Sequence, residues 1–135
     1  MARLEVKGMD DGVLPWAQMA RLPEELLDEM LDAEADIIVK AQRDVGEKMG
    51  VKRSGGMLKS IKKTKVKRKN AERYIDVRPT GRNESGTLNR EVGFYNEFGK
   101  KGQPARPFMR TANEENIDKA VDEAAKIYDN WLDSL

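Results

Sequence analysis

The basic residues between positions 62 and 73 form the densest group of positively charged side chains in this sequence. Seven bases stand there against one acid: Lys62, Lys63, Lys65, Lys67, Arg68, Lys69 and Arg73. Such a run can neutralise nucleic-acid phosphates without reading bases. It contains no aromatic side chain for base stacking, and neither a helix-turn-helix pattern nor a zinc module accompanies it. The run therefore predicts a contact surface, for non-specific DNA binding or for another subunit.

An acidic stretch precedes this basic run. Residues 24–36 contain seven acids and no base, so the formal net charge of +1 conceals a strong segregation of charge. Runs of one sign most often form a solvated face. They can also attract an oppositely charged face on a neighbouring copy of the chain. The second interpretation predicts that the acidic and basic stretches pair between adjacent subunits.

Catalytic and cofactor chemistry finds little support in the composition. The chain has no cysteine and no histidine, which removes thiolate nucleophiles, the usual zinc ligands and the commonest general base. Carboxylates are numerous, but none stands in an apolar setting that would raise its pKa. The segment Gly55-Gly56-Met57-Leu58-Lys59-Ser60 has Leu58 where a phosphate-binding loop needs glycine before Lys-Ser. We expect no enzyme activity, no cofactor and no metal.

Two long helices must position these residues. Apolar residues recur every three, four or seven positions over residues 23–49, with one skipped turn at Glu34, and Gly50 ends the pattern as a left-handed residue. The second helix is predicted to begin at Thr111, because residues 111–114 have the form of a capping box. Its apolar stripe includes Tyr128 and Trp131, which we interpret as core or interface aromatics.

Alternating patterns predict strands at residues 4–7, 62–68, 74–78 and 90–94. Residues 79–87 have little to bury and predict a long mobile loop between strands, and a brief helix is expected after Pro15. Together these elements predict an α+β fold, an antiparallel sheet of three to four strands with two long helices packed on one face. The 135 residues fit a single domain, 1–135, and no apolar run approaches the roughly 18 residues that span a bilayer.

Two connecting segments between the predicted elements have distinctive residues. In the first, Ser54 can cap a short helical turn, Gly55 permits a sharp bend, and three apolar residues have the spacing of one turn on a core: Met57, Leu58 and Ile61. In the second, Tyr95 and Phe98 are spaced as in one helical turn, and Gly99 permits the exit. Two prolines then hold the chain extended and deliver two apolar side chains to the core: Pro104 and Pro107, then Phe108 and Met109.

In this order, the pieces resemble a family of tail-completion or head-tail joining proteins of long-tailed bacteriophages, often labelled minor tail components. The resemblance covers nearly the whole chain, beginning with a strand that ends at Val6-Lys7-Gly8. The family pattern Thr-Gly-x-Leu-x-x-Ser-Ile is matched by Ser54-Gly55-Gly56-Met57-Leu58-Lys59-Ser60-Ile61, with Ser for Thr and Met for Leu. A Tyr-x-x-x-Glu-x-Gly-like block is matched by residues 94–99, and Lys100 follows where Thr is frequent. A Pro-Phe-Met block is matched by residues 106–112.

The resemblance implies a structural protein that joins or completes the tail at the neck of a phage or prophage particle, as a ring through which DNA passes. It implies no catalytic residues, and it makes one set of residues responsible for shape: Ser54, Gly55, Met57, Ser60, Ile61, Tyr95, Glu97, Phe98, Gly99, Pro107 and Phe108. The implied partners are further copies of the chain, phage connector and tail proteins, and non-specifically bound DNA, without a membrane.

The same resemblance implies that the protein is made in the host cytoplasm and ends in the virion, and the charged residues 1–7 also favour cytoplasmic synthesis. Residues 79–89 and 100–106 are expected to order only on contact with neighbours. The alternative function is a small nucleic-acid-binding protein that uses the basic run.

Overall fold

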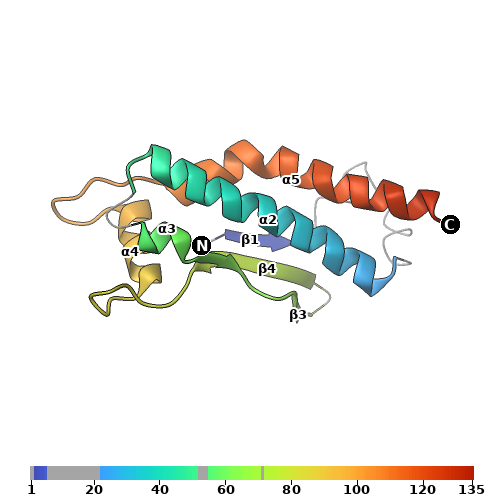
Figure 1. Cartoon of the computed structure of the whole chain (residues 1–135), viewed down its shortest axis with the longest axis horizontal. Helices are drawn as coiled ribbons and strands as arrows, with labels where there is room; N and C mark the ends of the chain where they lie inside the picture. Colours follow the sequence, from blue (N-terminus) through green and yellow to red (C-terminus); the bar gives the residue numbers. More distant parts are fainter. Residues whose placement is uncertain (1, 6–21, 52–54, 71) are drawn as a thin grey trace.

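The computed structural model describes residues 2–5, 22–51, 55–70 and 72–135. Its elements follow in the order β1 (Ala2–Glu5), α2 (Glu24–Lys48), α3 (Gly56–Lys59), β2 (Ile61–Lys63), β3 (Lys67–Lys69), β4 (Glu72–Pro79), α4 (Asn89–Phe98) and α5 (Phe108–Asp133). Figure 1 shows α2 and α5 lying side by side along an elongated molecule, with the sheet beneath them and α3 and α4 at one end. The predicted α+β class is confirmed.

The long strand β4 is the centre of the antiparallel sheet. On one side it pairs with β1, where Ala2 lies opposite Val77. On the other side β2 pairs with its end near Pro79 and β3 with its beginning near Tyr74. The sheet is thus three strands wide, because two short strands share one edge of β4. The single strand predicted over residues 62–68 is divided in two, and the strand predicted at residues 4–7 lies at Ala2–Glu5, with its last two residues outside the described part.

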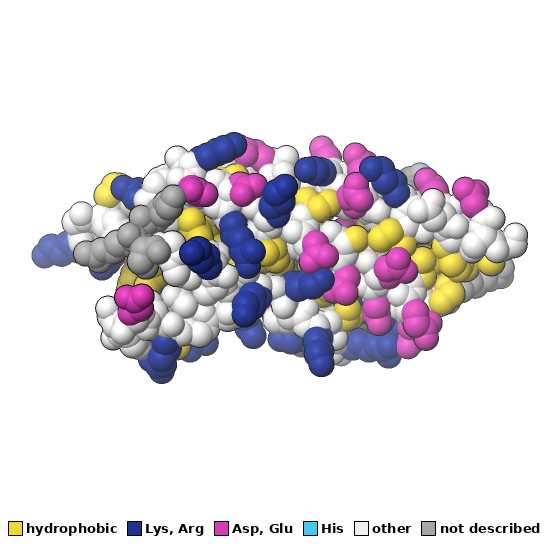
Figure 2. All heavy atoms as spheres, viewed as in Figure 1, with side chains coloured by type: hydrophobic (Ala, Val, Ile, Leu, Met, Phe, Trp, Pro, Cys, Tyr) yellow, Lys and Arg dark blue, Asp and Glu magenta, His cyan; other side chains and the backbone are white. Residues whose placement is uncertain are grey.

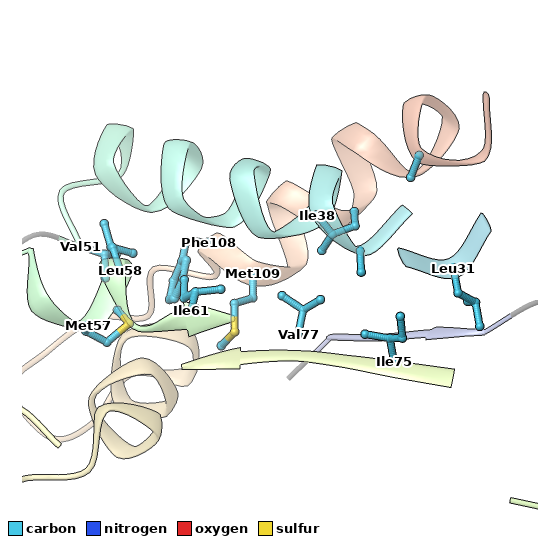
Figure 3. Close-up of a cluster of buried hydrophobic side chains, with 12 residues drawn as sticks. Leu31, Ile38, Val51, Met57, Leu58, Ile61, Ile75, Val77, Phe108 and Met109 are labelled. Carbon is cyan, nitrogen blue, oxygen red and sulfur yellow. The ribbon is translucent and has the colours of Figure 1, made fainter. Parts of the chain in front are cut away.

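The main core fills the space between the sheet and the helices. Alternation along β4 points Ile75 and Val77 inward, as predicted, and both are fully buried. Leu31 and Ile38 reach them from α2, and Phe108 adds its ring at the start of α5 (Figure 3). The extended segment before α5 therefore delivers Phe108 to the core as the two prolines predicted.

A second, smaller cluster lies near the beginning of α2 and the end of α5. Leu26, Met30 and Ala124 are buried in it, and the half-buried rings of Tyr128 and Trp131 pack against it. The two ring centroids are 6.1 Å apart. The interpretation of this aromatic pair as packing residues is confirmed.

The strand predicted at residues 90–94 is wrong, because this segment belongs to α4. Its buried residues are Asn89, Gly93 and Glu97, spaced every four positions. A helix whose buried face is polar or small gives no apolar period of 3.6, so the chance alternation around Val92 and Phe94 dominated the sequence pattern. The loop before α4 consequently joins a strand to a helix and does not lie between strands.

The two loops expected to order only on contact are held by hydrogen bonds within the chain. In the first, the Asn83 side chain accepts hydrogen bonds from the backbone N–H groups of Ser85 and Thr87, each at 3.0 Å. In the second, the Arg106 backbone N–H donates to the Asn96 carbonyl at 2.6 Å. These bonds favour one conformation of each loop within a single chain, which weighs against the expectation.

The predicted capping box at Thr111 is also wrong. Helix α5 begins at Phe108, three residues earlier, and the Thr111 N–H donates to the Pro107 carbonyl at 3.0 Å as an ordinary helical residue. Pro107 stands at the cap position and has no cap hydrogen bond from its own side chain. Two of the first N–H groups of α5, those of Met109 and Arg110, are instead bound by a side chain of α4.

The glycine connector behaves as its sequence indicates. Gly50 and Gly55 both have positive φ, 78° and 77°, after the end of α2 and before α3. Met57 and Leu58 are buried in the short helix, whereas Ile61, also buried, already belongs to β2. The proposed cap at Ser54 and the helix expected after Pro15 lie outside the described residues.

One carboxylate contradicts the expectation that none occupies an apolar setting. Glu34 stands on α2 one turn from the fully buried Met30 and Ile38, and only 5% of it is exposed. Burial raises its pKa from 4.5 to about 7, because the charged form loses its hydration there. The skipped turn in the apolar pattern of α2 was the sequence signal for this residue.

We predict that Gly55→Val destabilises the fold by about 1–3 kcal/mol, because a β-branched residue is strained at positive φ. Among the described residues, a Cβ at this position would meet only the Lys59 Cε, at 3.9 Å, so the backbone conformation dominates the cost. Denaturant unfolding measures the change. The control is Gly55→Asn, which tolerates this conformation and should lose less. Equal stability of Gly55→Val and the parent would contradict the assigned turn.

We predict that stability falls as pH rises from about 4.5 to about 7, because folding holds the proton of Glu34 more tightly than the unfolded chain does. Glu34→Gln should remove this fall and stabilise the protein at pH 8 by on the order of 2 kcal/mol. Unfolding curves across this pH range test it. The exposed Glu29→Gln on the same helix is the control and should keep the slope of the parent.

Candidate interaction surfaces

The basic run and the acidic stretch meet within one chain. The Arg68 guanidinium lies 2.6 Å from the Glu24 carboxylate, and Arg73 reaches both Glu24, at 3.0 Å, and Asp28. Lys63 lies 2.8 Å from Asp36. The prediction that these stretches pair between adjacent subunits is therefore wrong, since β3 and β4 place the bases directly beside α2.

Two of the groups in these contacts, Glu24 and Lys63, have shifted pKa values. The hydrogen bond from Arg68, followed by its charge, lowers the pKa of the exposed Glu24 carboxyl. The hydrogen bond to Asp36 raises the pKa of Lys63 against the opposing effect of burial. Both shifts favour the charged forms, so the pairing persists at neutral pH. It forms an intramolecular clamp between α2 and the edge of the sheet.

Pairing reduces the basic surface that remains for a partner. Lys67 lies 3.6 Å from Asp76, in addition to the pairs above. Within the described part of the chain, three exposed lysines of the run carry no ion pair: Lys62, Lys65 and Lys69. They lie on or between β2 and β3 at one edge of the sheet. This edge is the available part of the predicted DNA or subunit contact.

The second and third motifs of the resemblance are joined by Glu97. One oxygen of its buried carboxylate accepts the Met109 N–H at 2.9 Å, and the other accepts the Arg110 N–H at 3.0 Å. A carboxylate at this position satisfies two orphan donors and meets the positive end of the α5 dipole. Glu97 thus supplies from α4 the cap that Thr111 does not supply. Sequence analysis singled out Glu97, but nothing in the sequence indicated its partner.

Gly99 is required by the close return of the chain after α4. Its φ is 79°, and a Cβ there would lie 2.9 Å from both the Ala105 nitrogen and the Gln103 oxygen. No side chain fits this contact, because both neighbours are backbone atoms. Gly99 therefore determines the path of the chain between α4 and the segment before α5.

The first motif lies at the same end of the molecule. Ser60 donates its hydroxyl hydrogen to the Met57 carbonyl at 2.6 Å, and its own carbonyl accepts the Thr80 hydroxyl at 2.7 Å. Gly55 and Met57 line a groove that is also lined by Tyr95 of α4 and by Arg106. The three motifs, which are separated in sequence, are brought together here.

Two aromatic residues assigned to shape are exposed instead. Tyr95 is 42% and Phe98 64% exposed, and Phe94, which sequence analysis did not select, is 55% exposed. The Phe94 ring centroid lies 4.9 Å from that of Phe98 and 6.0 Å from that of Tyr95. The Lys100 ammonium lies 5.1 Å from the Tyr95 ring centroid. We call the side chains of Phe94, Tyr95 and Phe98 the aromatic patch.

Metal and membrane chemistry find no site in the described residues. They contain no group of three or more acidic side chains placed to hold a metal ion. None of their helices is both long and apolar enough to cross a bilayer. Three surface features remain suited to a partner. They are the sheet edge with Lys62, Lys65 and Lys69, which we call the lysine edge, the groove lined by Gly55, Met57 and Tyr95, and the aromatic patch.

Comparison of the chain with protein-family models, with curated proteins and with solved structures gave no match.

We predict that Glu97→Ala destabilises the fold by about 1–2 kcal/mol, because it leaves two N–H groups at the start of α5 unsatisfied. Thermal unfolding measures the loss. The exposed Glu91→Ala on the same helix is the matched control and should change stability little. If both variants melt together with the parent, the cap does not contribute to stability.

Proposed function

We propose that this protein is a structural virion component that acts in head-tail joining or tail completion of a long-tailed phage or prophage, as a ring at the neck. The observation that supports it best is the Glu97 contact with the beginning of α5, which joins two motifs of the resemblance. Motifs that hold each other in place are expected if the whole pattern, and not a chance match, is shared with the family.

The roles of the remaining motif residues support the same proposal. Gly55 and Gly99 supply positive φ where the chain turns, and Ile61 and Phe108 are fully buried. These are roles in shape, as expected for a particle component. Tyr95 and Phe98 differ, because their exposure makes them available to a neighbouring protein.

Subunit contacts in the proposed ring cannot rest on pairing between the two charge runs, because their paired members already meet within one chain. The Arg68 and Arg73 guanidinium groups are already engaged by α2. The lysine edge of Lys62, Lys65 and Lys69 would face DNA in the lumen, since it offers positive charge without a geometry that reads bases.

The alternative function, a small nucleic-acid-binding protein, rests on the same lysine edge. It is weakened by the ion pairs, which occupy four of the seven bases of the run. Three free lysines on a sheet edge release few counterions.

The proposed function is tested in the organism or phage that encodes the chain. We expect deletion of the gene to leave filled heads and separate tails, and we expect complementation to restore joined particles. Mass spectrometry and electron microscopy of purified particles should place the protein at the neck. Normal infectious particles from the deletion, free of the protein, would overturn the proposal.

We predict that the purified protein binds duplex DNA weakly and without sequence preference. With three free lysines, the logarithm of the association constant should fall with the logarithm of the salt concentration, with a slope of roughly −3. Fluorescence anisotropy over a salt series measures it. Replacing Lys62, Lys65 and Lys69 by Gln should abolish binding, whereas the same change at three exposed lysines of α2 and α5 should not: Lys40, Lys48 and Lys119. A tight complex with one particular duplex would instead support the alternative function.

A further inference from the structure

We infer that the aromatic patch of α4 docks on the far end of a second copy of this chain, where α2 begins and α5 ends. The inference rests on the proposed function in one respect, namely that the contact would build the proposed ring. The contact itself belongs to the purified chain, so it can be tested separately from any role in a particle.

The aromatic patch is the largest group of exposed aromatic side chains in the described residues. Phe94, Tyr95 and Phe98 expose on the order of 300 Å² together, given the usual area of aromatic side chains. A patch of this size equals the largest apolar patch of a typical monomer, and such a patch is often functional. Because the rings already contact each other, they present one preformed surface with little side-chain entropy left to lose.

The surroundings of the patch determine which partner fits. Arg90 lies one helical turn before Phe94, and Lys100 and Lys101 follow α4; all three are exposed. Glu91 is the one exposed acid of α4. Two identical patches would place these cations against each other, and like charges across an interface are strongly unfavourable. The partner surface must therefore be apolar and acidic.

The opposite end of the same chain has this chemistry. Leu132 is 42% exposed at the end of α5, beside the half-buried Tyr128 and Trp131. Exposed acids without an ion pair in the described residues lie on the first turns of α2 and the last turns of α5: Glu25, Glu29, Asp129 and Asp133. Figure 2 shows apolar atoms among acidic groups at this end, while basic groups predominate at the other.

The placement of the two surfaces determines the assembly that results. Figure 1 shows α4 and the end of α5 at opposite ends of the long axis. A contact between two different surfaces is heterologous, and it yields a ring when the rotation between copies closes. The patch covers well below the ~800 Å² per partner of a stable interface, so free chains should associate weakly and assemble on a template.

Cysteine cross-linking tests the contact, because the natural chain contains no cysteine. Phe98→Cys and Leu132→Cys are purified separately, one of them isotope-labelled, and mixed under mild oxidation. We expect mixed dimers in about tenfold greater yield than with Ile117→Cys as the second partner, because docking raises the effective concentration of the thiols. Ile117 is the matched control, since it is also on α5 and is also 42% exposed.

Charge reversal provides the second arm. Changing Lys100 and Lys101 to Glu, or Asp129 and Asp133 to Lys, should each weaken self-association in sedimentation experiments about tenfold. Mixing the two variants should restore it, because each reversed surface then meets its reversed complement. A fold defect cannot produce this rescue.

Two outcomes would overturn the inference. Preferential disulfide dimers between two Phe98→Cys chains would show that the aromatic patch binds a second aromatic patch. Equal yields of mixed dimers with Leu132→Cys and with Ile117→Cys would show that the two ends do not dock. Cross-linking in the purified chain without any copy at the neck would refute the proposed function alone. A neck location without cross-linking would refute only this contact.

Discussion

The close approach at Gly46 is the contact on which the arrangement of the helices depends. A Cβ at this position of α2 would lie 2.5 Å from a Leu58 methyl carbon and 3.1 Å from the Phe108 ring. The absence of a side chain lets α3 and the start of α5 press against the same turn of α2, where close packing leaves no room for an added carbon. From there α5 can run back along α2, and the sheet can close the core from below (Figure 3).

Local periodicity predicted the elements whose stability depends on apolar burial, and it failed where polar or small residues take that role. The apolar stripe of α2 and the alternation of Ile75 and Val77 are repeated within a few residues, so the sequence shows them directly. The buried face of α4 is Asn89, Gly93 and Glu97, which no hydrophobic pattern reveals. The start of α5 depends on Glu97 across a loop, a tertiary contact that a local capping motif cannot show.

The charge segregation shows a different limit of sequence reasoning. The complementarity of the acidic and basic stretches was evident, but the same attraction can act within a chain or between chains. The choice depends on the path of β3 and β4, which brings Arg68 and Arg73 under the first turns of α2. Most of these pairs are exposed and contribute little stability individually. Their main consequence is negative, because they remove those charges from the surface available to partners.

The aromatic patch and Glu34 both depart, within the described residues, from the rule that apolar groups are buried and charges solvated. Such departures cost stability and are expected at functional or strained sites. Glu34 is buried on α2, so its protonation affects the stability of the fold. The aromatic patch lies outside on α4, where its removal would disturb none of the buried clusters. A fold that does not need these three rings nevertheless holds them together on one surface, and contact with another protein gives that arrangement a physical reason.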